Sequence, residues 1–476
     1  MIAHSLEKNR RLLFVLLVFS VASLYCQEFT NLYNFRDTDG ASPFAALSFS
    51  GSTLYGTTSL RGSFDQGTVF AMSTDGVSFQ TIHTFSAVNN ETNADGSYPV
   101  APVLVSGQTL YGTASGGGSS GNGTVFAVKG DSSGFTNLHN FTSIDGTSPA
   151  GLTLSSGILY GIAQEGGTSQ KGTIFKVSTN GGDFSILHNF HGTDDGVNPS
   201  GCLVISGTRL YGVAAYGGMN GNGTVFAMNT DGSGFVRLHD FSTTSGGPFY
   251  TNYDGINPFA ALTLSGDTLY GTASYGGDYG NGTIFTVCTN GTNFSVLHSF
   301  STLQNEPSTG LATNNDGGGP TGLVLSGNIL YGTTGFGGNR ANGTVFQVNT
   351  NGTHFATLHS FTQNNNAYGT NSDGADPIGG VVLSNGALYG TANFGGVFGN
   401  GTIFRISVRP TLITQMVGTN LLLTWQSNFS GFNLESTTNL TLPMWTNVSP
   451  SPVIVSGRNT VTNQILGGQR FYRLSQ

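Results

Sequence analysis

Large apolar residues alternate with small or polar ones in short runs along most of the chain, as in Leu152-Thr153-Leu154. Such alternation predicts half-buried strands, because successive side chains of a strand point to opposite faces. The runs are separated by turn sequences such as Ser50-Gly51 and Asp75-Gly76, which suit tight hairpins. We therefore expect a succession of short antiparallel strands.

This pattern is repeated. The tripeptide Leu-Tyr-Gly occurs seven times, with its tyrosine at Tyr55, Tyr111, Tyr160, Tyr211, Tyr270, Tyr331 and Tyr389. In every case the phenylalanine of a Gly-Thr-Val/Ile-Phe segment follows 15 residues later. Six of these phenylalanines are followed, 13 residues on, by a histidine in a further strand, at His83, His139, His188, His239, His298 and His359. Four short strands in a repeat of about 50 residues are typical of a β-propeller blade, and kelch blades have a similar period.

The two ends of the repeat array complement each other. No histidine segment follows the seventh Gly-Thr-Ile-Phe, which ends at Phe404. The missing segment precedes the first repeat as Leu32-Tyr33-Asn34-Phe35, with Tyr33 in the histidine's place. An N-terminal strand that completes the last blade leaves no open sheet edge. We therefore predict an all-β fold in which residues 27–408 form a seven-bladed β-propeller closed by its N-terminal strand.

The repeat unit, with its Leu-Tyr-Gly, Gly-Gly and Gly-Thr-Val-Phe segments, resembles that of the bacterial choice-of-anchor GloVer-type tandem-repeat family. The resemblance covers roughly residues 30–405. It implies export and a repeat fold, and it implies no particular activity.

The composition changes after residue 408, and both tryptophans, Trp425 and Trp445, lie beyond it. Runs such as 421–425, 432–436 and 470–474 are typical of short strands. Residues 409–476 are therefore expected to form a small β-sandwich similar to immunoglobulin or fibronectin type III domains.

The N-terminus has the pattern of a signal peptide over residues 1–26. Lys8 and Arg10 precede an apolar run over residues 12–25 that is too short to span a bilayer stably. We expect a secreted or outer-surface protein with no transmembrane segment in the mature chain. A lipoprotein acylated at Cys26 is the less favoured alternative.

The chain is acidic, with a formal net charge of −8, and has no basic cluster beyond its N-terminus. This charge distribution argues against a nucleic-acid partner. Glycine-rich segments such as Gly121-Asn122-Gly123 lack the Lys-Ser/Thr of a phosphate-binding loop, and no cofactor is indicated.

Two recurring sets of polar residues are candidates for chemistry. The histidines occur once per repeat, too sparsely for a metal site that needs three or four donors, and we interpret them as packing residues. An aspartate precedes the first strand of every repeat, at Asp39, Asp95, Asp145, Asp195, Asp254, Asp316 and Asp373. These carboxylates are expected to form a ring at one mouth of the channel, as a cation site or collar. The favoured alternative is that each accepts backbone N–H bonds within its own Asp-Gly turn.

An active site should break the sevenfold pattern. Glu165 and Glu306 are the non-repeated candidates for a catalytic role, which would make the protein an extracellular polysaccharide-acting enzyme. Glycoside cleavage needs two carboxylates roughly 5 to 9.5 Å apart, which is difficult across a ring. No metal site and no established catalytic set are predicted.

Binding is the favoured function. Four long connections, at 86–94, 242–253, 301–315 and 362–372, are rich in Asn, Thr, Ser and Gly and carry Phe249, Tyr250, Tyr253 and Tyr368. Loops on a rigid scaffold commonly carry recognition, and amides beside exposed rings suit sugar or protein surfaces. We expect an adhesion module for extracellular carbohydrate or protein. The alternative of a purely structural surface repeat protein remains open.

Overall fold

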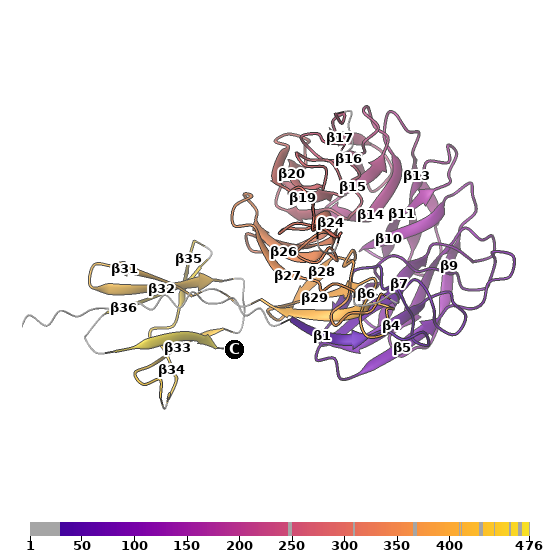
Figure 1. Ribbon diagram of the computed structural model, residues 1–476. Coiled ribbons are helices and arrows are strands. Elements are labelled where there is room, and N and C mark those ends of the chain that lie inside the picture. The colour runs from indigo at the N-terminus through magenta and orange to yellow at the C-terminus, as the bar shows by residue number, and fades with distance from the viewer. Residues whose placement is uncertain are drawn as a thin grey trace, which may run out of the picture.

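The computed structural model describes residues 29–245, 250–307, 310–364, 369–408, 410, 412–427, 432–441, 443–456, 458–464 and 469–475. These residues form strands and no helix (Figure 1). The repeat region contains seven four-stranded antiparallel sheets, which we number in chain order.

Each sheet is a meander of sequential strands. Sheet 1 contains β2 (Ser48–Ser50), β3 (Thr53–Thr58), β4 (Thr68–Ser73) and β5 (Phe79–Thr84). Sheet 2 contains β6 (Leu104–Ser106), β7 (Thr109–Ala114), β8 (Thr124–Lys129) and β9 (Thr136–Asn140). Sheet 3 contains β10 (Thr147–Ser155), β11 (Ile158–Glu165), β12 (Thr173–Ser178) and β13 (Ser185–Asn189). Sheet 4 contains β14 (Val197–Ser206), β15 (Arg209–Tyr216), β16 (Thr224–Asn229) and β17 (Val236–Asp240).

The last three sheets follow the same plan. Sheet 5 contains β18 (Thr263–Ser265), β19 (Thr268–Ala273), β20 (Thr283–Cys288) and β21 (Ser295–Ser299). Sheet 6 contains β24 (Gly318–Ser326), β25 (Ile329–Phe336), β26 (Thr344–Asn349) and β27 (Ala356–Ser360). Sheet 7 contains β28 (Val381–Ser384), β29 (Ala387–Ala392), β30 (Thr402–Ser407) and β1 (Phe29–Asn34). A two-stranded hairpin, β22 (Gln304–Asn305) and β23 (Ala312–Thr313), lies in the connection between sheets 5 and 6.

The N-terminal strand completes sheet 7, as the sequence predicts. β1 pairs antiparallel with β30, with Tyr33 opposite Ile403 and Asn34 opposite Thr402. Figure 1 shows β1, in indigo, next to the orange strands of sheet 7. Two ends of the array that are about 370 residues apart therefore share one sheet.

Buried side chains join every sheet to the next, and the last sheet to the first. One cluster contains Phe35, Leu54, Phe70 and Tyr389, from sheets 1 and 7, and six others lie between successive sheets. The phenylalanine of each Gly-Thr-Val/Ile-Phe segment, such as Phe226, is fully buried. The hydrophobic positions of the repeat therefore face neighbouring sheets, and the sheets form a closed, propeller-like ring.

Backbone hydrogen bonds at one end of the sheets also join each sheet to the preceding one, and the first sheet to the last. The residue before each proline of the Asp-Gly-x-x-Pro motif donates its N–H to a carbonyl of the preceding sheet at 2.9–3.2 Å. In the last of these contacts Ser42 donates to Asn400. The proline itself packs on the glycine that begins the preceding Gly-Thr-Val/Ile-Phe segment. At Gly123 an added Cβ would lie 2.5 Å from Pro149 Cδ, and φ is +99°. A side chain there would collide with the next sheet.

The C-terminal residues form two further sheets. One has the order β31 (Ile413–Val417), β32 (Asn420–Gln426), β36 (Arg458–Gln464), β35 (Val453–Val455), and the other β34 (Thr446–Asn447), β33 (Asn433–Thr437), β37 (Phe471–Ser475). Both contribute to one core that contains Leu423, Trp425, Leu434 and Val461. The strands predicted at 421–425, 432–436 and 470–474 coincide closely with β32, β33 and β37.

Candidate binding site

The recurring histidines and aspartates meet in pairs, which the sequence did not predict. In each pair a histidine Nε2 lies 2.9–3.1 Å from an aspartate Oδ2: His83 and Asp95, His139 and Asp145, His188 and Asp195, His239 and Asp254, His298 and Asp316, His359 and Asp373. In the seventh pair Tyr33 replaces the histidine, and its hydroxyl donates to Asp39 Oδ2 at 2.5 Å. Each pair ties the last strand of one sheet to the connection that leads into the next.

The contacts around these pairs hold neighbouring sheets together. Each aromatic ring of the pairs stacks on a phenylalanine of the next sheet, with centroids 3.5–4.1 Å apart, as His83 does on Phe135. The carboxylates also accept the N–H of the residue that follows the last strand's phenylalanine, such as Ser86 for Asp95. The carboxylates therefore accept backbone N–H bonds, as the favoured alternative predicts, but the donors precede the aspartate: they are local in the short connections, as for Gly192 and Asp195, and distant in the long ones, as for Ser86 and Asp95.

Burial and hydrogen bonding have opposite effects on the pKa of four of these carboxyls. Burial alone would raise the pKa of Asp195, but hydrogen bonds from His188 and from the N–H groups of His191 and Gly192 lower it to about 2. The pKa values of Asp95, Asp254 and Asp316 are lowered by the same balance. Within the described residues no group of three or more His, Cys, Asp or Glu is placed to hold a metal ion. A ring of these carboxylates at the channel mouth stays a prediction.

The connections between sheets are of two kinds. The short ones precede sheets 1, 3 and 4, and there a glycine N–H of the adjacent loop, such as Gly167, donates to a backbone carbonyl of the connection at 2.9–3.0 Å. The long ones precede sheets 2, 5, 6 and 7 and contain an asparagine two residues before the aspartate: Asn93, Asn252, Asn314 and Asn371. In these connections the side-chain oxygen of the asparagine accepts the N–H of the loop glycine, which a backbone carbonyl accepts in the short connections.

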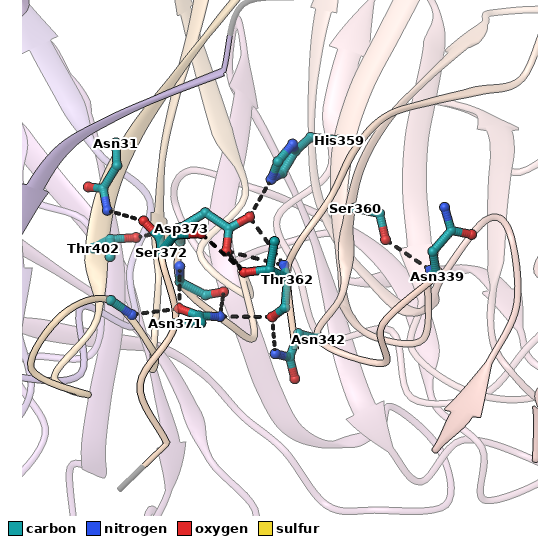
Figure 2. A network of polar contacts seen from close by, with 12 residues as sticks. Asn31, Asn339, Asn342, His359, Ser360, Thr362, Asn371, Ser372, Asp373 and Thr402 are labelled. Carbon is teal, nitrogen blue, oxygen red and sulfur yellow. Dashed lines mark hydrogen bonds and ion pairs between the residues drawn. The ribbon is translucent and has the colours of Figure 1, made fainter. Parts of the chain in front are cut away.

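Asn371 illustrates this clamp (Figure 2). Its Oδ1 accepts the N–H groups of Gly374 and Gly396 at 2.8 and 2.7 Å. Its Nδ2 donates to the carbonyls of Thr362 and Gly374 at 2.8 and 2.7 Å. One side chain therefore fixes both ends of the connection, and the residues between them are free to vary in number.

Exposed aromatic rings gather on one face of the ring of sheets. In a meander, the loop between the second and third strands lies at the same end of the sheet as the connection to the next sheet. We call this end the loop face. Of the eleven Phe and Tyr residues that are exposed among the described residues of the repeat region, nine lie on it, with exposed fractions of 39–64%. They are Phe64, Tyr98, Tyr216, Tyr250, Tyr253, Tyr275, Tyr279, Phe394 and Phe398.

Four rings on consecutive sheets occupy equivalent positions. Tyr216, Tyr275, Phe336 and Phe394 each lie five residues beyond a Leu-Tyr-Gly tyrosine, where the second strand ends. We call them the aromatic arc. Tyr275 and Phe336 stack with their centroids 6.2 Å apart. The corresponding residues of sheets 1 to 3 are Leu60, Gly116 and Glu165, so the arc covers only one part of the loop face.

Two clefts open beside the arc. The cleft between sheets 6 and 7 has a volume of about 530 Å³ and is lined by Phe336, Phe394 and Asp376 together with amides and glycines. The cleft between sheets 5 and 6 has a volume of about 1060 Å³ and is lined mainly by Asn, Thr and Ser, with Tyr279, Glu306 and Arg340. The loop that contains Arg340 and Asn342 separates the two clefts.

The candidate residues from the sequence lie partly in this region. Tyr250 and Tyr253 are on the loop face and are 63% and 64% exposed. Phe249 and Tyr368 lie outside the described residues. Glu306 lines the cleft between sheets 5 and 6, whereas Glu165 ends β11 in sheet 3. The two glutamates therefore belong to different parts of the ring. The aromatic arc and Asp376 were missed, although the fixed spacing from Leu-Tyr-Gly would have revealed the arc.

None of the described residues belongs to a helix with the length and hydropathy that crossing a membrane requires. The chain is an all-β, propeller-like repeat protein. It belongs to the Gloeobacter/Verrucomicrobia repeat family, whose model matches residues 17–194, 148–317 and 249–436. No curated protein matches the chain.

Several solved structures are similar at low identity. An oligogalacturonate lyase from Vibrio parahaemolyticus is 10% identical, with 81% of this chain and 95% of that chain covered and a TM-score of 0.48. TolB from Acinetobacter baumannii is 12% identical, with 74% and 80% covered and a TM-score of 0.35. Similarities of this size carry no argument about ligands or activity.

Proposed function

We propose that this protein is an exported surface module. In this proposal, residues 1–26 are a signal peptide, residues 27–408 are a seven-bladed β-propeller, and residues 409–476 are a small Ig-like sandwich. The N-terminal charge and apolar run, the pairing of β1 with β30 and the two-sheet C-terminal core support this organisation.

The proposed function of the propeller is to bind extracellular glycans through its loop face. The observation that carries this proposal is the concentration of exposed aromatic rings on that face, next to two clefts lined by amides and hydroxyls. Aromatic faces pack against the apolar faces of sugar rings, while amides pair with the hydroxyl groups. A contiguous exposed apolar surface with polar surroundings commonly marks a binding site.

A glycan array tests this function. The wild-type protein is expected to bind at least one class of polysaccharide, and Tyr275→Ala combined with Phe394→Ala should reduce the signal at least tenfold. Phe49→Ala is the matched control, since Phe49 is 44% exposed but lies in the first strand, next to the hairpin turn at the opposite face. No binding to any glycan, or equal loss in the double variant and the control, would contradict the proposal.

The second candidate is a polysaccharide-acting enzyme, favoured by the position of Glu306 in the larger cleft. Its test is the release of reducing ends from polysaccharides that the protein binds. Hydrolysis by the wild type that is abolished in Glu306→Gln would establish it. Binding without hydrolysis would leave the protein as a binding or structural surface module.

A further inference from the structure

Asp376 breaks the repeat at a position that faces a cleft. It precedes the proline of its Asp-Gly-x-x-Pro motif, and the equivalent residues of the other six sheets are all neutral: Ser42, Tyr98, Ser148, Asn198, Asn257 and Gly319. All seven residues have φ between +52° and +63°. At this position the backbone φ is therefore similar in all seven sheets, and only sheet 7 has a charged side chain there.

The carboxylate of Asp376 is held in place. Asn393 Nδ2 donates to Asp376 Oδ2 at 3.1 Å, and the backbone N–H of Asp376 donates to the carbonyl of Asn342 at 3.0 Å. A Cβ added at Gly335 of sheet 6 would lie 2.9 Å from Asp376 Oδ1. Oδ1 therefore points across the cleft toward sheet 6, where a glycine leaves it room.

The charge of the Asp376 carboxylate is not balanced by any cationic side chain among the described residues. Burial raises its pKa, the Asn393 hydrogen bond lowers it only in part, and none of the cationic side chains that the structure describes contributes. A half-buried carboxylate in this situation is stabilised by a cation that enters the cleft.

Two aromatic rings line the cleft together with Asp376, and one of them is fixed by packing. Phe336 lies against Gly318 and Gly319, where an added Cβ would come within 2.3 and 2.6 Å of its ring, and it stacks on Tyr275. Phe394 lines the other side and is 49% exposed. Aromatic faces attract cations and also pack on sugar rings. Asn342 and Asn364 add hydrogen-bonding groups to the same cleft.

We propose that the cleft between sheets 6 and 7 binds an amino sugar, with its protonated amine on Asp376 and its ring between Phe336 and Phe394. This assignment rests on the proposed glycan-binding function and names the sugar class. A lysine side chain shares the ammonium but has neither a ring to fill the space between the two phenylalanines nor hydroxyl groups for Asn342 and Asn364.

Calorimetric titration with two hexasaccharides tests the assignment at pH 6. One is the glucosamine hexamer, which carries free amines, and the other is its fully N-acetylated counterpart. The glucosamine hexamer should bind the wild type more tightly, and Asp376→Asn should weaken its binding about tenfold while changing the acetylated hexamer less than twofold. Asparagine occupies the equivalent position in sheets 4 and 5, so the fold accommodates this variant. Asp267→Asn, an exposed carboxylate in a turn on the opposite face, is the control.

The outcomes separate the two proposals. If the hexamers bind equally and Asp376→Asn alters neither, the amino-sugar site is refuted while glycan binding stands. A lysine-rich peptide that binds more tightly than the glucosamine hexamer, with the same sensitivity to Asp376→Asn, also refutes it. If no glycan binds the wild type on the array or in titration, the glycan-binding function itself fails.

Discussion

The interior of the seven sheets and their loop face follow different rules. In the interior the same residues recur from sheet to sheet, and a phenylalanine such as Phe175 or Phe226 is fully buried in each. On the loop face the equivalent position is an aromatic ring in sheets 4 to 7 but Leu60, Gly116 or Glu165 in sheets 1 to 3. The interior must fit two neighbouring sheets at once, whereas the loop face meets only solvent or a ligand.

The connections show how the two regions are kept apart. Three short connections bind the adjacent loop through a backbone carbonyl, and four long ones use an asparagine clamp such as Asn371 to reach the same geometry. Long connections precede sheets 5, 6 and 7, which also border both clefts. Variation in length and composition is thus confined to the face where we propose that binding occurs.

Removing β1 should break the interior most severely. A chain that begins at residue 37 loses Phe35 from the core, the stack of Phe29 on His359 and that of Tyr33 on Phe79. The loss of the fully buried Phe35 ring alone costs about 3 to 5 kcal/mol of unfolding free energy, the two lost stacks add to this cost, and the edge of sheet 7 becomes exposed. Thermal unfolding should show a large drop in midpoint relative to a chain that begins at residue 27. Equal midpoints would mean that the ring does not depend on this strand.

Two substitutions ten residues apart in sheet 4 compare the interior with the loop face. Phe226→Ala removes a fully buried ring and should lower the unfolding free energy by about 3 to 5 kcal/mol. Tyr216→Ala removes a ring that is 49% exposed and should change it by less than about 0.5 kcal/mol. Urea titration measures both. A large loss from Tyr216→Ala would show that the loop face also maintains the fold.

The interior was the more predictable region because it is periodic. The offset of 15 between tyrosine and phenylalanine predicted the strands, and the displaced Leu32–Phe35 segment predicted the closing pair with β30. The histidine–aspartate pairs escaped prediction because their separation varies from 6 residues in His139–Asp145 to 18 in His298–Asp316. The available signal was that each repeat has one such aspartate and one such histidine, or Tyr33 in the histidine's place. The sequence contained no comparable signal for the two clefts, because they form where loops of different sheets meet.

The asparagine clamp joins the two regions, so its loss should have an intermediate effect. Asn371→Ala deletes four hydrogen bonds and leaves two glycine N–H groups without their acceptor, at a cost of about 2 to 3 kcal/mol. Ser372→Ala, in the next and exposed residue, is the control and should be nearly neutral. Hydrogen exchange at Gly374 and Gly396 should accelerate in Asn371→Ala only. Unchanged exchange would mean that backbone bonds alone hold the long connections.

The carboxylates that tie the sheets together predict the response to acid. Asp195 has a pKa of about 2 in the folded chain, against about 3.9 in an unfolded one, so the folded state binds fewer protons between these values. Its contribution to stability is complete above pH 4 and is lost as the pH falls toward 2, by about 2 kcal/mol. Asp95, Asp254 and Asp316 act in the same direction because their pKa values are also lowered.

Urea titrations of the wild type and Asp195→Asn at several pH values between 2 and 5 measure this contribution. The variant should be less stable at pH 5, and its stability should fall less steeply with acid, because one titrating group has been removed. Identical pH slopes would show that the Asp195 carboxylate gains nothing from its partners in the folded chain. The interior of sheet 4 would then be held by the apolar packing of Phe190 and Phe226 rather than by its charged tie.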